Sequence, residues 1–158
     1  MTHTFDEVVT SRARLREIVG EPSHRVTAKV IDRVDDICRR FIAAAPFVVL
    51  ATRGADGLLD QSPKGDPAGF VTVLDDKTLA IPDRPGNHRF DTFANILATG
   101  RIALMFMVPN RSEVVRVNGT AQIVRNLPLR ETMAINGRVP EFAILVRVEE
   151  AFYHCGKA

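Results

Sequence analysis

The chain has 158 residues, 46% of them hydrophobic and 25% charged, which is enough for one globular domain with a core and too little for two. Its formal net charge is +2, and the scattered Lys and Arg residues weakly favour an anionic ligand over a nucleic-acid surface. With no Trp and one Tyr, it also lacks aromatic residues that could stack on bases. We therefore expect a single domain over residues 1–158 that does not bind nucleic acid.

The apolar runs and the cysteines indicate where the protein works. The N-terminal residues include acidic side chains and no apolar segment, so we expect no signal peptide. The longest apolar run, residues 41–51, is broken by Pro46 and is too short to span a bilayer. Cys38 and Cys155 lie far apart without a Cys-x-x-Cys partner, which favours free thiols over the alternative of one disulfide. These features predict a cytoplasmic protein that does not enter a membrane.

Two helices are predicted before the first strand, in a leader over about residues 10–44. The first begins after Thr10 or Ser11, either of which can cap a helix, and ends before Gly20. The second is predicted over residues 23–44, where apolar residues recur at three- and four-residue spacing. The residues expected to face inward are Leu15, Ile18 and Val19 in the first helix, and Val26, Val30, Val34, Ile37 and Phe41 in the second.

After Pro46 the chain consists mainly of short apolar strands joined by turn sequences. Asp56-Gly57 and residues 75–77 each predict a β-hairpin. Asn118-Gly119 predicts a bulge within a strand. The predicted strands are residues 47–52, 58–61, 69–74, 78–81, 102–108, 113–124 and 142–152.

Two further helices are predicted among these strands. The first, residues 88–98, is expected to bury Phe90, Phe93, Ala94 and Leu97. The second, residues 127–137, contains Pro128 in its first turn, where proline is tolerated. Because strands and helices do not alternate as in βαβ units, the sequence argues against a doubly wound parallel sheet. The pattern predicts a mainly β fold, a small antiparallel barrel with peripheral helices.

Two basic turns predict a binding site for a small anion, most readily a phosphate. Ser62 and Lys64 are expected in a loop that follows a strand. Arg84 and Arg89 flank a Pro-Gly-Asn turn that ends at Asn87, the expected N-cap of the next helix. The positive end of a helix dipole repels a cation in the first turn, and a bound anion would relieve that conflict. The alternative for each turn is a solvated loop without a ligand.

Other candidate residues give weaker signals. Arg116 lies within an apolar strand, and the sequence leaves open whether it is a surface residue or a third contact to the ligand. The four histidines are isolated and none has ligand spacing, so no metal site is expected. Adjacent His154 and Cys155 would point to opposite faces of a strand, which argues against a catalytic pair. No Walker loop, GxGxxG or Gly-x-Ser-x-Gly motif is present.

With these residues in place, the sequence resembles the pyridoxamine 5′-phosphate oxidase-like proteins, the FMN-binding split-barrel superfamily. The leader from residue 26 to 41 and the ending from residue 148 to 157 are similar as well, so the resemblance covers nearly the whole chain. Residues 83–87 with the following helix are the most specific part. The segments that carry the resemblance are residues 47–52, 60–66, 79–87 and 95–97, then Arg89 and residues 115–119.

The resemblance implies a six-stranded antiparallel split β-barrel that forms a homodimer, with FMN bound at the dimer interface. It implies that Lys64 and Arg89 bind the FMN phosphate with help from Ser62 and Asn87. The backbone of Ala80, Ile81 and Pro82 would lie along the isoalloxazine, and Arg116 and Asn118 would approach the flavin from their strand. The candidate cofactor-binding residues are therefore Ser62, Lys64, Ala80, Ile81, Pro82, Arg84, Asn87, Arg89, Arg116 and Asn118.

These features lead to the hypothesis of an FMN-dependent oxidoreductase that acts on a small-molecule substrate. In this superfamily the flavin carries the redox chemistry while the protein positions it. The sequence lacks the C-terminal Arg/Trp region of true pyridoxamine phosphate oxidases, so no particular substrate or catalytic residue is implied. The alternatives are a flavin-binding or flavin-sensing protein without turnover, a split barrel that binds deazaflavin F420 or haem, and a structural barrel with solvated turns.

Overall fold

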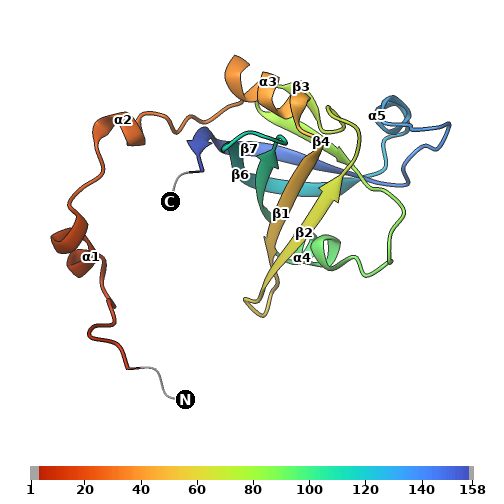
Figure 1. The fold of residues 1–158 in the computed structure, drawn as a ribbon. Coiled ribbons are helices and arrows are strands. Elements are labelled where there is room, and N and C mark those ends of the chain that lie inside the picture. The colour runs from red at the N-terminus through yellow and green to blue at the C-terminus, as the bar shows by residue number, and fades with distance from the viewer. Residues whose placement is uncertain (1–3, 157–158) are drawn as a thin grey trace.

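The computed structural model describes residues 4–156, apart from the side chains of Arg25 and Val26. Its centre is one seven-stranded antiparallel sheet in the order β2-β1-β5-β6-β7-β4-β3 (Figure 1). The edge strands β2 and β3 do not pair with each other, so the sheet curls without closing. The strands are β1 (Phe47–Arg53), β2 (Leu59–Gly65), β3 (Thr72–Asp75), β4 (Thr78–Pro82), β5 (Arg101–Met107), β6 (Glu113–Val124) and β7 (Ala143–Cys155).

The strand predictions are confirmed in number and order, with changes at several ends. Both predicted hairpins exist, β1 with β2 and β3 with β4. The pairing of β6 with β7 shifts register between Asn118 and Gly119, which confirms the predicted bulge. The count of six strands implied by the resemblance is wrong, since all seven apolar segments pair in one sheet. The expected split barrel is therefore present as one curled sheet that stays open between its edge strands.

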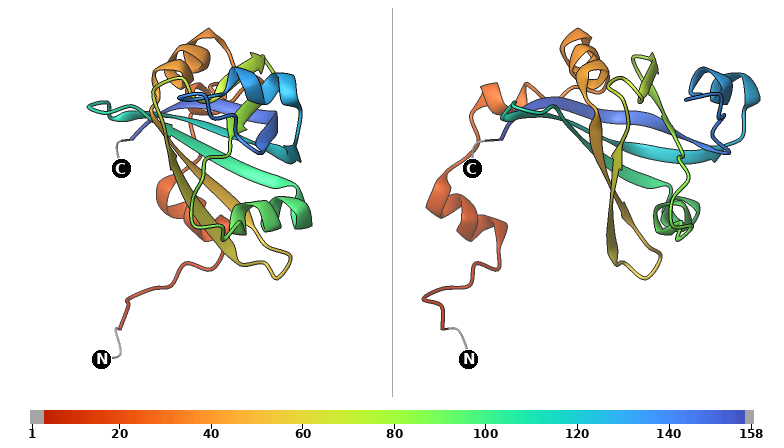
Figure 2. Two further views of the ribbon diagram at one scale, coloured as in Figure 1. Left: turned by 90° about the vertical axis from the view of Figure 1, so that its right-hand side faces the viewer. Right: turned by 45° about the vertical axis from the view of Figure 1, so that its right-hand side comes forward.

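The helices lie outside the sheet, and two of them complete the core. The helices are α1 (Arg12–Val19), α2 (His24–Thr27), α3 (Asp36–Ala44), α4 (Asp91–Thr99) and α5 (Leu127–Thr132). Figure 2 shows α3 and α4 at opposite ends of the curled sheet. Phe41 and Ile42 of α3 and Phe93 and Ile96 of α4 join the buried strand residues in one hydrophobic cluster. The core therefore lies on the concave side of the sheet.

The predicted helix over residues 23–44 is wrong, because the chain forms two separate helices there. Ile31 pairs with Ala151 of β7 through two backbone hydrogen bonds, which holds the chain extended between α2 and α3. Asp35 then starts α3 by accepting a hydrogen bond from the backbone N–H of Cys38, at 2.8 Å. Of the residues expected to face inward, Val34 and Phe41 are buried, Val30 and Ile37 are exposed, and the Val26 side chain lies outside the described residues.

The first helix is confirmed as α1, but its expected burial is wrong. Ser11 caps α1 by accepting a hydrogen bond from the backbone N–H of Arg14, and Gly20 ends it. Leu15, Ile18 and Val19 are exposed because this part of the chain extends away from the sheet (Figures 1 and 2). Among the described residues, no helix is long and apolar enough to cross a membrane.

Both cysteines are free. Cys38 is buried on α3, and its pKa is raised to about 12 by burial and by the neighbouring Asp35 carboxylate. Cys155 is exposed at the end of β7. The predicted free thiols are therefore confirmed, and the alternative of a disulfide is excluded in this structure.

Candidate functional site

Ser62 and Lys64 lie within β2, and not in a loop after a strand as predicted. Pro63 is tolerated between them because β2 is an edge strand, where a missing N–H leaves no ladder bond unmade. In the register with β1, Ser62 faces Leu50 and Lys64 faces Val48, and both of these partners are fully buried. Ser62 and Lys64 therefore point to the concave side of the sheet.

The helix that follows the second basic turn starts later than predicted, because residues with left-handed backbone conformation precede it. Asn87 is not the N-cap; its side-chain oxygen accepts a hydrogen bond from the backbone N–H of Arg89, at 3.1 Å, before the helix begins. His88 and Phe90 have φ values of 58° and 56°, and Phe90 takes the N-cap position of α4. Such conformations are costly for bulky residues and interrupt a helix. As a result α4 begins at Asp91, and Arg89 lies before it.

The later start of α4 also changes which face of the helix is buried. The prediction is correct for Phe93, which is buried, and wrong for Phe90, Ala94 and Leu97, which are exposed. The buried residues of α4 are Thr92, Phe93 and Ile96.

The concave side of β2, the segment 83–90 and the first turn of α4 surround a cavity of about 380 Å³. Residues 91–93 belong to its lining, and their backbone N–H groups have no partner within the helix, as at any helix N-terminus. The positive end of the α4 dipole therefore faces the cavity. Five of the predicted site residues line it, namely Ser62, Lys64, Arg84, Asn87 and Arg89.

The Lys64 and Arg89 side chains have partners that a ligand can replace. Lys64 Nζ lies 3.7 Å from the Asp83 carboxylate, a loose ion pair. Arg89 Nε lies 2.7 Å from the Asp91 carboxylate, and its side chain is 73% exposed, so this pair is worth little. Both cations are therefore available to an anion in the cavity.

Arg84 has a structural role in this cavity wall. Its Nε donates to the Asp66 carboxylate at 2.6 Å, and its Nη1 donates to the backbone carbonyl of Met133 at 2.9 Å. These bonds fasten the segment 83–90 both to the chain after β2 and to the chain after α5. Arg84 lines the cavity as predicted, but most of its hydrogen-bonding capacity is already in use.

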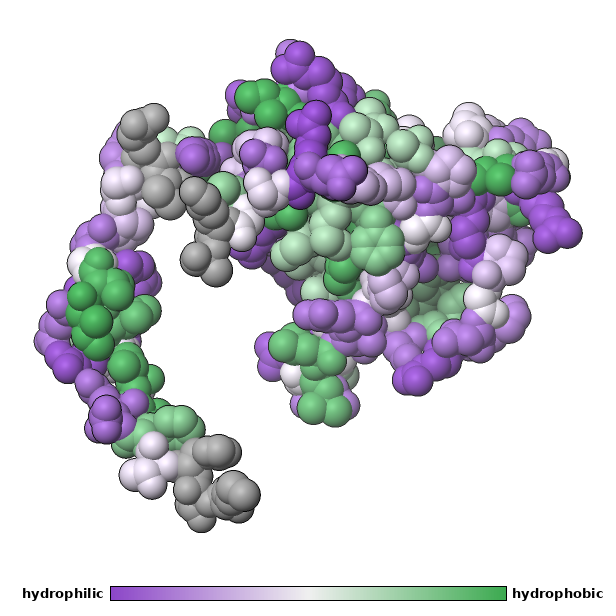
Figure 3. Space-filling view, viewed as in Figure 1, coloured by the Kyte–Doolittle hydropathy of each residue, from purple (hydrophilic) through white to green (hydrophobic). Residues whose placement is uncertain are grey.

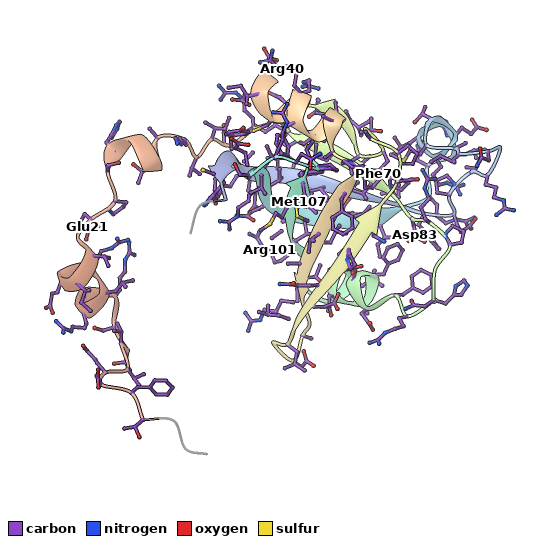
Figure 4. All side chains as sticks on the ribbon, in the orientation of Figure 1. Glu21, Arg40, Phe70, Asp83, Arg101 and Met107 are labelled. Atoms are coloured by element: carbon purple, nitrogen blue, oxygen red, sulfur yellow. The ribbon has the colours of Figure 1, made fainter. Side chains whose placement is uncertain are left out.

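Asp83 brings a negative charge into the same cavity (labelled in Figure 4). Burial raises the pKa of its carboxyl above the ordinary value, against the opposing attraction of Lys64. An anion that binds here therefore meets less repulsion when this carboxyl is protonated.

The other predicted residues lie outside this cavity. Ala80, Ile81 and Pro82 are buried in β4, and the pairing of β4 with β3 ends at Ala80, so the last residues of β4 have a strand neighbour only on the β7 side. Arg116 and Asn118 lie on the convex face of the sheet, because they alternate with the buried Val115, Val117 and Gly119 along β6.

Within one chain, Arg116 lies on the convex face of the sheet, away from the cavity. Its guanidinium carbon lies 4.9 Å from the centre of the Phe152 ring, in a cation–π contact on the convex face. Asn118 lies opposite Ala103 of β5 and Glu150 of β7. One chain by itself therefore does not bring Arg116 or Asn118 together with Lys64.

Several residues of the cavity were not predicted from the sequence. Asp60 lies on the same face of β2 as Ser62, and the Thr92 hydroxyl donates to its carboxylate at 3.3 Å. Beside them, Asn95 donates to the buried Thr52 hydroxyl at 3.0 Å. The alternation of Asp60, Ser62 and Lys64 at every second residue was the signal that this segment is a strand. Among the residues that the structure describes, no group of three or more His, Cys, Asp or Glu side chains could hold a metal ion.

The curled open sheet, with its polar cavity between an edge strand and a helix N-terminus, defines the class of split-barrel proteins. The chain belongs to the pyridoxamine 5′-phosphate oxidase family, since residues 34–155 match the sequence model of that family. No curated protein matches the chain.

Solved structures support the same fold. HupZ of Group A Streptococcus is 23% identical with a TM-score of 0.63, over 79% of this chain and 97% of that one. A candidate pyridoxamine 5′-phosphate oxidase of Lactobacillus delbrueckii is 25% identical with a TM-score of 0.60, over 77% and 95% of the two chains. An F420 reductase is 18% identical with a TM-score of 0.51, over 70% and 92%. The split-barrel fold and the family are thus confirmed.

Proposed function

We propose that this protein is an FMN-dependent oxidoreductase for a small organic substrate. The observation that carries the proposal is the cavity that Lys64 and Arg89, from separate parts of the chain, both line beside the first turn of α4. Two displaceable cations and free backbone N–H groups are the donors that a phosphate monoester needs. The family to which the chain belongs supports the choice of a phosphate-bearing flavin.

The residues of the cavity suit that cofactor in position and in chemistry. Lys64 and Arg89 would hold the phosphate, and the Ser62 hydroxyl and the Asn87 amide would add hydrogen bonds. The end of β4, with no strand on one edge, would offer backbone groups to the ring system. When bound, the flavin supplies the redox chemistry, and the protein supplies position and electrostatics.

The proposal includes a homodimer with the flavin at the subunit interface. The convex face of the sheet carries a continuous apolar surface, visible over β1 and β5 in Figure 3. Its exposed or partly exposed members are Phe47, Val49, Ala51, Ala103, Met105, Met107, Val114 and Phe152. An apolar surface of this kind is typical of a protein interface. Arg116 and Asn118 lie on this face, so in a dimer they would approach the flavin across the interface.

A cytoplasmic location belongs to the same proposal. Both cysteines are unpaired, and free thiols are typical of a reducing compartment.

The test compares FMN binding to the wild type and to the Lys64→Ala, Arg89→Ala double variant, measured by the quenching of FMN fluorescence. Charge-assisted hydrogen bonds are worth about 1.5–3 kcal/mol each, so the affinity should fall by well over tenfold. Arg111→Ala removes an exposed arginine outside the cavity and should leave the affinity unchanged. An unchanged affinity in the double variant would refute the phosphate site.

The same preparations distinguish the alternatives. A two-banded flavin spectrum that NAD(P)H bleaches and air restores supports an oxidoreductase. A flavin spectrum that no donor bleaches supports a sensor. A Soret band would indicate haem as the ligand in place of FMN, and preferential binding of F420 would indicate the deazaflavin.

A further inference from the structure

A second cavity, of about 770 Å³, lies against the segment 83–90. Its opposite wall is the chain from Ile135 to Phe142, between α5 and β7 (Figure 1). The two cavities share Asp83, Arg84, Pro85, His88 and Phe90, so the segment 83–90 is their common wall. None of the phosphate-site residues Ser62, Lys64 and Arg89 lines the second cavity.

The walls of the second cavity are mainly apolar. They are formed by Pro85, Phe90, Ile135, Val139, Pro140 and Phe142. Phe90 and Phe142 are both held by the buried Phe93, whose ring centre lies 5.2 Å from that of Phe90 and 5.7 Å from that of Phe142. Aromatic contacts at these distances stabilise the packing of neighbouring rings. The two rings therefore form an apolar wall that suits a flat hydrophobic ligand.

One positive charge in this cavity has no counterpart. Asp83 pairs with Lys64, Arg84 pairs with Asp66, and Glu141 pairs with Arg125 and Arg130. Within residues 4–156, the Arg138 guanidinium makes no hydrogen bond or ion pair. Since His88 and Asn136 are the other polar groups of the lining, a single unmatched cation faces an apolar cavity.

The segment that presents Arg138 is held at both ends. Ile135 and Arg138 exchange two backbone hydrogen bonds, at 3.2 and 2.9 Å, around a tight Asn136-Gly137 turn. Residues paired in this way project their side chains to the same face, so Ile135 and Arg138 line the cavity together. Further on, Nη1 of the buried Arg130 donates to the carbonyls of Pro140 and Glu141. The backbone of this segment is thus held in place, and it carries the exposed Arg138 side chain at the edge of the cavity.

We propose that this cavity binds a compact aromatic carboxylate. The ring would lie against Phe90 and Phe142, and the carboxylate would accept two hydrogen bonds from the Arg138 guanidinium. A monoanion matches the single free charge, whereas a dianionic phosphate would face Asp83 and Glu141 with only one unpaired cation. The proposal goes beyond the function proposed above, because binding at this cavity does not depend on FMN in the first one.

The test uses the full chain and 2-naphthoate as the probe. Binding is measured by isothermal titration calorimetry and by changes in amide chemical shifts. We expect saturable binding with shifts concentrated in residues 135–142. Arg138→Ala should weaken naphthoate binding by at least about tenfold, the loss expected for one charged hydrogen-bonding partner. Neutral 2-naphthalenemethanol should bind the wild type and Arg138→Ala equally, and Arg138→Lys should recover part of the naphthoate affinity.

Two control variants keep the outcome interpretable. Val139 is 41% exposed on the cavity wall, so Val139→Trp should fold normally, fill the cavity and block both naphthyl probes. The Lys64→Ala, Arg89→Ala variant should bind naphthoate as the wild type does. Failure of the FMN titration with naphthoate binding intact would overturn only the flavin proposal. Absence of naphthoate binding at millimolar concentration, or binding that depends on Lys64 and Arg89 but not on Arg138, would overturn this one.

Discussion

At the scale of single residues, the candidate site is governed by how each cation is paired. The sequence predicted that Lys64, Arg84 and Arg89 belong to one site, and all three line one cavity. It could not predict that Arg84 is bound to Asp66 and to the carbonyl of Met133, because both partners come from distant parts of the chain. Local sequence thus reveals which side chains can bind an anion, and tertiary structure decides which of them are free to do so.

Asp83 competes with an anionic ligand for Lys64. The folded protein raises the pKa of its carboxyl, chiefly by burial, so this group favours folding in its protonated form. Its contribution to stability is present below the unfolded-state pKa and is lost as the pH rises through the raised folded-state pKa. Affinity for an anion follows the same direction, because deprotonation places a negative charge beside Lys64.

We expect Asp83→Asn to bind sulfate more tightly at neutral pH and to lose the part of the pH dependence that Asp83 causes. Removal of one partly buried ion-pair partner, worth up to ~1 kcal/mol, predicts roughly a fivefold gain. Sulfate is the suitable probe because its charge is constant over this range. Sulfate titrations between pH 4 and 8, with His88→Gln present in both proteins to remove the imidazole, measure the effect. Parallel pH profiles for the two proteins would show that Asp83 does not face the anion.

At the scale of secondary structure, the sequence predicted elements whose signals are local. The hairpins of β1 with β2 and of β3 with β4 follow from turn residues inside each hairpin. The prediction of one helix over residues 23–44 was wrong because Ile31 pairs with Ala151, a strand residue far along the chain. The predicted start of α4 was wrong because a left-handed backbone at bulky residues such as Phe90 has no sequence signature. Long-range pairing and strain are the parts that periodicity cannot show.

The bulge in β6 depends on Gly119 for a steric reason. A Cβ placed on Gly119 would lie 2.0 Å from the carbonyl oxygen of Arg147 in β7, a backbone atom that can shift only if the β6–β7 pairing distorts. We expect Gly119→Ala to destabilise the fold by about 1–3 kcal/mol, as overpacking does. Gly86→Ala is the matched control, since its nearest atom is 3.8 Å away, and should lie within about 0.5 kcal/mol of the wild type. Urea unfolding curves compare the two, and equal midpoints would show that the bulge can relax.

At the scale of the whole molecule, an open sheet leaves its convex face without cover from its own chain. The helices α3 and α4 contribute to the core on the concave side, and the described part of the N-terminal arm extends away from the sheet (Figures 1 and 2). The sequence predicted seven apolar strands and the resemblance implied a six-stranded split barrel, but neither predicted that all seven strands pair in one sheet whose edge strands stay apart. The apolar surface on β1 and β5 is where the proposed homodimer would form.

Met105 lies near the middle of that surface and tests the dimer. Its side chain is 40% exposed, and it pairs with Val49 on one side and Arg116 on the other. Met105→Glu should fold normally, because Arg116 can balance the new charge in a single chain. A carboxylate buried against a second apolar surface is costly, so the variant should be monomeric and should retain less FMN.

Light scattering after size-exclusion chromatography measures the molar mass of the wild type and of Met105→Glu. Leu97→Glu is the control, since Leu97 is 78% exposed on α4. The wild type and Leu97→Glu should have twice the mass of one chain, and Met105→Glu the mass of one. A monomeric wild type would exclude the homodimer, and with it any role for Arg116 and Asn118 across an interface. A dimeric Met105→Glu would place the interface on another face of the sheet, because burial of that carboxylate, even beside Arg116, costs more than the few apolar contacts that Met105 can make there.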